Sequence, residues 1–482
     1  MTRQQLPLVL QAIEALNTGQ RRYAASLLRQ ELDAAPAGSA RWPSVSRLAA
    51  EIGEIEIAVE AARRGASSGA LDSLLSYWAI LATYGRSQDA LAEIAALPPR
   101  TRKQPSVLHF LATLAGEQGQ FAEAHRLFRQ ALSQAPDAQQ IWFGLAMTKT
   151  FEMVDGDRDA MEALLKRVRP GDSDTQARLL YAIGKAWGDI GEADRAFSYF
   201  SRGAAMKKRL EPYNTDEPTQ FLERAIRDFN PENMAKLMPS DGPSQRSLFV
   251  TGLPRSGTTL VQQILAAHSA VGDGAEVNLA RPALLPTLDF TMEGALAYQA
   301  RASGRNPWGE IAADYREFID VRFRSAGLVV DKSLNQSMLM GLLLHSIPEA
   351  RVVWLRRQPE DTALSCFSTF FTSLPWSWSL TDIAKHFRNE DRLFQHWLSL
   401  FPDRIFSLEY ECLTQDPRKW IPAVLRHFGL KYEEKVYEFH RLKTNVRTAS
   451  VLQVRSPLSS ARIGAARAYS RHLEPFRQAY YD

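Results

Sequence analysis

The sequence predicts a chain of two parts, an all-α array of paired helices followed by an α/β domain with a parallel sheet. A glycine and an alanine five residues apart recur along the first part, at intervals of 34, 32 and 34 residues between the first four glycines. After residue 246, short apolar runs alternate with helical stretches. A Pro-, Ser- and Gly-rich segment, 238–245, separates the two patterns. We therefore expect domains at 1–212 and 246–482, joined by a connector at 213–245.

Length and composition are those of a folded chain with more than one core. The 482 residues are 45% hydrophobic and 23% charged, which suffices for two or three domains. Ten Trp and 23 Phe argue against disorder. The net charge of +4 suits small anionic ligands, and no run of five like charges suggests a nucleic-acid arm. We expect no nucleic-acid partner.

Neither the cysteines nor the apolar segments indicate a special environment. Cys366 and Cys412 lie outside any CxxC or Cys/His cluster, so no zinc site is expected. Residues 1–20 make a poor signal peptide, because Gln and Glu interrupt a short apolar stretch. No segment has 18 uncharged apolar residues, so we expect no membrane span and a cytoplasmic location.

The first part carries the repeat in a form that paired helices explain. The glycine ends a first helix, where a left-handed residue is needed, and the small alanine lets the second helix pack closely. The matching pairs are Gly19/Ala24, Gly53/Ala58, Gly85/Ala90, Gly119/Ala124 and Gly191/Ala196, with a weaker copy around Gly156. The pattern resembles about six tetratricopeptide repeats. The alternative is a generic helical array with chance spacing. Such solenoids offer concave surfaces, so we expect a bound protein or peptide.

In the second part, four short runs have strand character. They are SLFV at 247–250, LVV at 328–330, RVVWL at 351–355 and RIFSL at 404–408. Strands separated by helical stretches indicate βαβ units and hence a parallel sheet.

The first of these strands leads into a glycine-bounded loop and then a helix, the layout of a P-loop. Gly252 and Gly257 let the backbone approach an anion, and the helix that follows offers free N–H groups and a favourable dipole. An NTPase loop needs G-K-[ST], but this chain has Gly-Thr-Thr and no lysine. The candidate anion ligands are Arg255, Ser256, Gly257, Thr258 and Thr259.

The string Leu-Pro-Arg-Ser-Gly-Thr-Thr-Leu at 253–260 resembles the 5′-phosphosulfate loop of sulfotransferases. In that family 3′-phosphoadenosine-5′-phosphosulfate (PAPS) donates a sulfuryl group. The likeness is greatest to tyrosylprotein sulfotransferases and to bacterial sulfotransferases with N-terminal tetratricopeptide repeats. It covers roughly residues 245–475 and, through the repeats, most of the chain.

The resemblance implies further donor ligands. Arg357 ends a predicted strand and Ser365 follows eight residues later, the spacing with which the family holds the 3′-phosphate, although Gln358 replaces the family's usual Asp. Tyr410 is expected either near the adenine or in the core. The late stretch at 445–455 suggests Ser450 as a contact. Candidates for phosphate pairing there are Arg447, Arg455, Arg462 and Arg467.

The resemblance also implies the catalytic groups. Glu276, about one helix length after the loop, is the expected general base. Lys332, at the end of a predicted strand, would support the leaving group together with Arg255. Asp331 is expected to pair with Lys332 or Arg255, and no metal is required.

Three functions are compatible with the sequence. The first is a PAPS-dependent sulfotransferase acting on a hydroxyl, with protein tyrosine, glycan, lipid and small-molecule acceptors all open. The second is a P-loop kinase or NTPase, which the missing lysine disfavours. The third is a non-catalytic repeat scaffold, which the set of Arg255, Lys332, Arg357 and Ser365 disfavours. A homodimer formed through the repeats also stays open.

Overall fold

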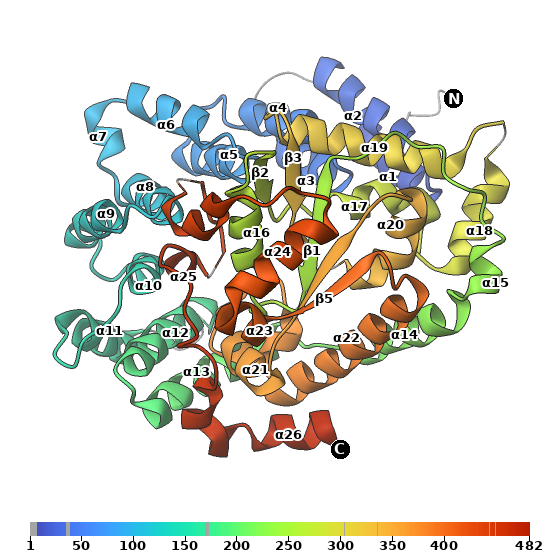
Figure 1. The fold of residues 1–482 in the computed structure, drawn as a ribbon. Coiled ribbons are helices and arrows are strands. Elements are labelled where there is room, and N and C mark those ends of the chain that lie inside the picture. The colour runs from blue at the N-terminus through green and yellow to red at the C-terminus, as the bar shows by residue number, and fades with distance from the viewer. Residues whose placement is uncertain are drawn as a thin grey trace.

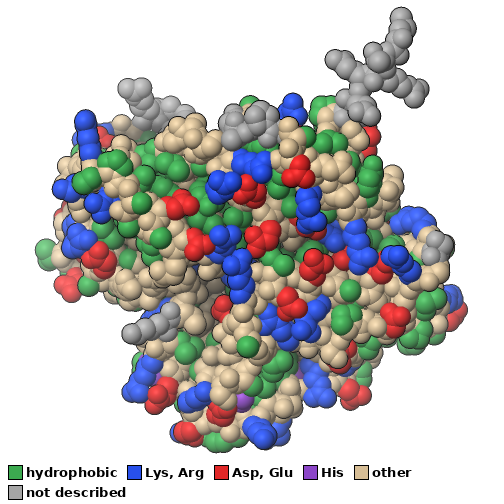
Figure 2. Space-filling model, turned by 90° about the horizontal axis from the view of Figure 1, so that it is seen from above, with side chains coloured by type: hydrophobic (Ala, Val, Ile, Leu, Met, Phe, Trp, Pro, Cys, Tyr) green, Lys and Arg blue, Asp and Glu red, His purple; other side chains and the backbone are tan. Residues whose placement is uncertain are grey.

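The helical array curves around one side of a central sheet. The structure is a computed structural model that describes residues 7–34, 39–168, 173–302, 304–334, 336–442, 444–448 and 450–482. In Figure 1 the array runs from blue to green along the top, left and bottom of the molecule, with the sheet in the middle. No helix among these residues is both long and apolar enough to span a bilayer. On the face drawn in Figure 2, acidic and basic side chains are interspersed and no patch of one sign dominates.

Within the described residues, the array consists of six consecutive helix pairs and one short helix, α7. The pairs are α1 (Leu8–Asn17) with α2 (Arg21–Ala34), α3 (Trp42–Glu51) with α4 (Ile55–Gly65), α5 (Leu71–Thr83) with α6 (Ser87–Ala96), α8 (Pro105–Glu117) with α9 (Phe121–Gln134), α10 (Gln139–Thr148) with α11 (Gly156–Arg167) and α12 (Ser173–Asp189) with α13 (Ala193–Leu210); α7 is Pro99–Arg102. The five predicted glycines have φ between +75° and +85°. Their alanine partners are at most 1% exposed. The paired-helix reading of the repeat is confirmed.

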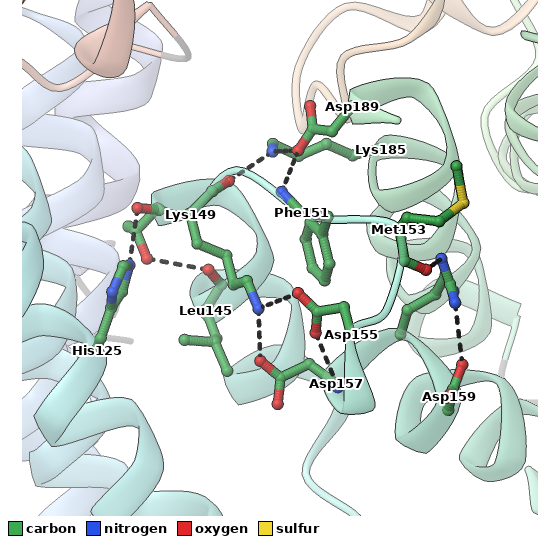
Figure 3. A network of polar contacts seen from close by, with 12 residues as sticks. His125, Leu145, Lys149, Phe151, Met153, Asp155, Asp157, Asp159, Lys185 and Asp189 are labelled. Carbon is green, nitrogen blue, oxygen red and sulfur yellow. Dashed lines mark hydrogen bonds and ion pairs between the residues drawn. The ribbon is translucent and has the colours of Figure 1, made fainter. Parts of the chain in front are cut away.

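The fifth pair turns differently from the others. Gly156 begins α11 and is not among the left-handed glycines. The chain between α10 and α11 is instead held by charges (Figure 3). Lys149 Nζ lies 2.6 Å from Asp155 Oδ2 and 2.8 Å from Asp157 Oδ2. Asp155 also accepts a hydrogen bond from the backbone N–H of Asp157 and so caps α11. A longer turn held by charges explains why this copy of the motif is weak.

The α/β domain is built on five parallel strands in the order β2-β3-β1-β4-β5. They are β1 (Ser247–Gly252), β2 (Val271–Ala275), β3 (Leu328–Asp331), β4 (Val352–Arg356) and β5 (Ile405–Glu409). Four of the five were predicted. β2 was missed because its sequence, VGDGA, has low strand propensity. All strands are parallel, so their carboxyl ends meet at one edge of the sheet.

Helices cover both faces of this sheet. On one face, α16, α24 and η4 pack on Val250, Val330 and Val353. On the other, α19, α20 and α22 pack on Phe249 and Val352. The remaining bounds are α14 (Asp216–Asp228), α15 (Pro231–Met234), α16 (Thr258–Ala266), α17 (Ala280–Leu284), η1 (Leu285–Thr287), α18 (Met292–Arg301), α19 (Pro307–Arg322), η2 (Ser337–Leu339), α20 (Met340–Ser346), α21 (Pro359–Phe367), η3 (Pro375–Trp378), α22 (Leu380–Leu400), α23 (Tyr410–Gln415), α24 (Pro417–His427), η4 (Glu434–Arg441), α25 (Val451–Val454), η5 (Ala465–His472) and α26 (Glu474–Tyr481).

The turns of the first four glycine-marked repeats face the α/β domain. A Cβ added at any of these glycines would come within 2.5–2.9 Å of an atom of that domain. The contacts are Gly19 with Pro286, Gly53 with Phe318, Gly85 with Arg322, and Gly119 with Arg455. Glycine is therefore needed here for close approach as well as for its left-handed backbone. Segment 238–245 contains no helix or strand, and the predicted domain boundaries stay predictions.

A buried ion pair links the array to α19. The side chain of Arg21 is 3% exposed, and its Nη1 and Nη2 each lie 2.8 Å from a carboxylate oxygen, of Glu54 and of Asp314 respectively. Arg21→Ala is expected to lower the free energy of unfolding by about 2 kcal/mol, because Asp314 and Glu54 lose their buried partner and keep only the exposed Arg22 and Arg29. The measurement is thermal unfolding by calorimetry.

The control is Arg126→Ala in the same array. The Arg126 side chain is 60% exposed and pairs with Glu123, so its loss should change stability by less than about 1 kcal/mol. Equal shifts for the two variants would contradict a stabilising role for the Arg21 contact.

Candidate functional site

The loop between β1 and α16 has a tightly constrained backbone. Gly252 has φ +144°, and an added Cβ would lie 2.4 Å from Leu355 O. Gly257 has φ +105°, and an added Cβ would lie 2.6 Å from the Tyr410 ring. Between them Arg255 is left-handed, with φ +69°. Left-handed non-glycine residues are uncommon and cluster at functional sites. The loop thus holds Arg255 in a backbone conformation that is unfavourable for a residue with a side chain.

Arg255 is a partly buried cation that has no carboxylate partner within the described ranges. Its Nε donates to Ser365 Oγ at 2.9 Å, and its Nη1 donates to Ser450 Oγ at 2.6 Å. Burial, together with repulsion from Arg462 and Arg357, lowers the pKa of the Arg255 guanidinium to about 10. At neutral pH the group is still charged. A partly buried charge with only hydroxyl partners indicates a site for an anion.

Two buried polar atoms beside Arg255 also lack partners. Ser256 Oγ and Arg357 Nε have no hydrogen-bond partner in the described part of the chain. Arg357 otherwise donates from Nη1 to Arg255 O at 3.1 Å and from Nη2 to Arg462 O at 2.8 Å. Its guanidinium lies 4.7 Å from the centre of the Tyr410 ring. The predicted ligands Arg357, Ser365, Tyr410 and Ser450 are therefore all close to the loop.

The amino end of α16 completes this cradle. Gly257 is the N-cap residue, and no side chain caps the first turn of the helix. Thr258 and Thr259 are 4% and 6% exposed. Thr259 Oγ1 lies 3.3 Å from Thr448 Oγ1. Uncapped N–H groups at a helix start, with hydroxyls and a cation beside them, favour a phosphate or sulfate group.

Two of the three predicted catalytic groups, Lys332 and Glu276, form an ion pair. Lys332 Nζ contacts Glu276 Oε2, and the two side chains are 1% and 34% exposed. Their strands are adjacent, with Lys332 N donating to Ala275 O at 3.0 Å. Gln262 of α16 donates to Gly274 O at 2.8 Å and ties the end of β2 to the helix of the loop. The end of β2, the end of β3 and the loop helix are thus joined.

Asp331 does not pair as expected. It accepts a hydrogen bond at 2.8 Å from the Tyr315 hydroxyl, and another from Ser333 Oγ. It makes no ion pair with Lys332 or Arg255, and its carboxylate instead binds the hydroxyl of Tyr315 from α19. Burial raises the pKa of Asp331 to about 6. These hydrogen bonds hold Asp331, the residue before Lys332, in place.

The late arginines differ from one another. Arg447 pairs with Glu117 at 3.2 Å, and the Arg455 guanidinium donates to backbone carbonyls, including Glu117 O. Neither is turned toward the loop as a free phosphate ligand. Arg462 acts on Arg255 electrostatically and accepts from Arg357 through its backbone. Arg467 is exposed in η5, and no contact joins it to the candidate ligands within the described ranges.

Sequence reasoning missed Thr448 and Glu117. Both lie far along the chain from the residues they contact, with 189 residues between Thr448 and Thr259. Thr448 lies in the late stretch at 445–455 that suggested Ser450, so that stretch was the available signal, whereas Glu117 carries no local motif. Among the described residues, no group of three His, Cys, Asp or Glu side chains could hold a metal ion.

Comparisons with known proteins agree with this architecture. Residues 247–434 match the model of the sulfotransferase family, and residues 49–212 match a tetratricopeptide-repeat model. The chain therefore carries tetratricopeptide repeats followed by a sulfotransferase domain. The sheet, its covering helices and the loop at 253–259 lie within the first match or at its edge.

A curated relative is an uncharacterized protein of Aquifex aeolicus (strain VF5). It is 28% identical over 392 residues, which are 77% of this chain and 49% of that protein. This chain thus spans about half the length of the curated relative it matches.

Similar solved structures are mostly sulfotransferases. The sulfotransferase domain of the Synechococcus PCC 7002 olefin synthase is 20% identical, covers 48% of this chain and 98% of its own, and has a TM-score of 0.31. Sulfotransferase STF9 from Mycobacterium avium is 16% identical, covers 69% and 98%, and has a TM-score of 0.30. Retinol dehydratase in complex with retinol and PAP is 16% identical, covers 56% and 95%, and has a TM-score of 0.29. Likeness at these scores is too weak to bear on function.

Proposed function

We propose that this protein is a sulfotransferase that uses PAPS and moves its sulfuryl group to an acceptor hydroxyl. The observation that carries the proposal is the partly buried guanidinium of Arg255, which has hydroxyl but no carboxylate partners among the described residues. The unpartnered Ser256 Oγ and Arg357 Nε beside it are further donors for an anion. A donor with two anionic groups fits the two cations Arg255 and Arg357 and the hydroxyls around them better than does a nucleoside triphosphate held by a loop lysine.

Donor binding is divided among three elements. The loop at 253–259 and the start of α16 would hold the 5′-phosphosulfate, with Arg255 as the charged group. Arg357 and Ser365 would hold the 3′-phosphate, with Ser450 closing over Arg255. Tyr410 lies under Arg357 and beside Gly257, so its ring would support the adenosine side of the site. Arg467 has no support from its position in this arrangement.

The proposed chemistry is an in-line transfer. The acceptor oxygen forms a bond to sulfur as the bond from sulfur to the 5′-phosphate oxygen breaks. Glu276 takes the acceptor proton as general base, and Lys332 offsets the charge that develops on the leaving oxygen. The two groups are already in contact, so base and leaving-group cation lie on neighbouring strand ends.

The acceptor is the least defined part of the proposal. A protein tyrosine is our first choice, because the loop resembles that of tyrosylprotein sulfotransferases and the repeats could hold a peptide or protein. The test is a screen with ³⁵S-labelled PAPS against tyrosine peptides, glycans, lipids and small alcohols. Transfer of label to an acceptor hydroxyl, with release of 3′-phosphoadenosine-5′-phosphate (PAP), is the expected result. A cytoplasmic location stays a prediction from the sequence.

Arg357→Ala is expected to weaken PAP binding by about 10- to 150-fold, because bonds from a charged donor contribute about 1.5–3 kcal/mol each. Titration calorimetry measures this directly. Arg351→Ala is the matched control, since Arg351 precedes the amino end of the same strand, is exposed, and contacts His427 O instead. Equal affinities for the two variants would contradict the assignment of Arg357.

A further inference from the structure

Residues 444–455, called here the late segment, contact the donor loop on one side. The segment is described at 444–448 and 450–455. The Ser450 hydroxyl accepts from Arg255, and the Thr448 hydroxyl lies 3.3 Å from that of Thr259. Thr444 Oγ1 donates to Gln263 Oε1 at 3.0 Å, farther along α16. The late segment therefore lies along the loop helix and closes the cradle from outside.

On its other side the late segment contacts two turns of the repeat array. Val446 N donates to Glu117 O at 2.9 Å. Arg447 Nε donates to Glu117 Oε1 at 3.2 Å. Asn445 Nδ2 donates to Ser87 Oγ at 3.3 Å. Ser87 begins α6 just after Gly85, and Glu117 ends α8 just before Gly119, so both contacts fall on the glycine-marked turns.

Arg455 fastens the late segment to the second of these turns. Its guanidinium donates to two nearby backbone carbonyls, Leu442 O and Thr444 O. It also donates to Glu117 O of the repeat array, at 3.4 Å. A Cβ at Gly119 would lie 2.9 Å from Arg455 Nε, so the turn leaves just enough room for this side chain. Burial lowers the pKa of Arg455, and no ion pair to a carboxylate forms in the described part of the chain. The sequence suggested Arg455 as a phosphate ligand, but in the structure it binds backbone carbonyl groups instead.

The late segment depends on these contacts for its position. It contains only the four-residue helix α25. Val446 and Val454 are its buried apolar anchors, each 3% exposed. Glu117 Oε2 and Arg455 Nε are buried without partners among the described residues, so the contact is not optimised for stability alone. A segment with little structure of its own takes its geometry from the surfaces that hold it.

We propose that the repeat turns at Ser87 and at Glu117–Gly119 are part of the donor site, because they position the late segment so that Ser450 and Thr448 complete the cradle. Glu117, Gly119 and Arg455 are positioning residues that act through the late segment. The inference rests on the proposed function, since PAPS is the donor whose affinity the turns would set. The repeat array then has a role in donor binding besides that of holding a partner.

The test compares alanine at two equivalent glycines in the full-length chain. Gly119→Ala and Gly191→Ala both place a side chain at a left-handed position, with φ +77° and +83°. An added Cβ meets Arg455 at the first position and nothing within 4 Å at the second. Titration calorimetry with PAP should show affinity about tenfold weaker for Gly119→Ala and unchanged for Gly191→Ala. Hydrogen exchange at the Val446 amide should be faster only in Gly119→Ala.

A double-mutant cycle separates positioning from direct contact. If Arg455 acts through the turn, Gly119→Ala combined with Arg455→Ala should bind PAP no more weakly than the worse single variant. Additive losses would overturn the positioning role and return Arg455 to the phosphate. Unchanged PAP binding by Gly119→Ala, in a chain that binds PAP, would overturn the inference and leave the proposed function standing. A wild-type chain that does not bind PAP would overturn both.

Discussion

Glu276→Gln is expected to lower the rate of sulfuryl transfer by about 10²- to 10⁴-fold, the usual contribution of a general base. Glutamine keeps the size of the side chain but accepts no proton from the acceptor hydroxyl. Because Glu276 lies at the end of β2 and not in the loop, PAP affinity should stay within a few-fold of wild type. The measurement is initial-rate transfer of ³⁵S label to the acceptor found in the screen.

The control for this prediction is Glu293→Gln. Glu293 is exposed in the first turn of α18, and its loss should leave the rate unchanged. Full activity of Glu276→Gln would remove the residue from the mechanism. A loss of activity accompanied by an equal loss of PAP affinity would assign Glu276 to binding instead.

Arg255→Met is expected to change stability and donor binding in opposite directions. The partly buried cation has no carboxylate partner among the described residues, and taking an unpaired charge out of water costs free energy that an apolar side chain avoids. The same change removes the charge that faces the donor, so PAP affinity should fall about 100-fold, at about 1.5–3 kcal/mol per charged bond. Calorimetry on the free protein gives Tm, and titration gives the affinity.

The direction of the stability change follows from the lowered pKa of Arg255. In the unfolded chain the guanidinium keeps its ordinary, higher pKa, and in the folded chain the pKa falls to about 10. The folded state therefore binds fewer protons between these values, and stability rises with pH only there. Below pH 10 the whole cost of burying the charge is present, so removing it at pH 7 should raise Tm. A lower Tm with unchanged PAP affinity would show that Arg255 is structural.

Local physics made most of the fold predictable. The glycine–alanine step has one simple cause, a left-handed helix end followed by a close helix contact, and it located five repeat turns. The loop at 252–257 was equally clear, because only glycine suits its two tight positions. Strand β2 was missed since pairing with β3 stabilises it and its own residues do not.

The parts of the site that depend on distant contacts could not be predicted. Asp331 was expected to pair with a cation, but its carboxylate instead accepts a hydrogen bond from Tyr315 of α19. Arg455 looked like a phosphate ligand in the sequence, yet it is taken up by carbonyls of the repeat turn and of its own segment. The first outcome depends on packing within the α/β domain and the second on packing of the repeat array against that domain, and no local sequence pattern indicates either.

The most direct test of the account is the affinity of the free protein for PAP compared with ATP, measured by titration calorimetry without an acceptor. We expect PAP to bind at least about tenfold more tightly than ATP. The loop lacks the lysine that binds a triphosphate, whereas Arg357 and Ser365 offer a second anion site. ATP binding that equals or exceeds PAP binding would contradict the central claim that this loop and its neighbours form a PAPS site.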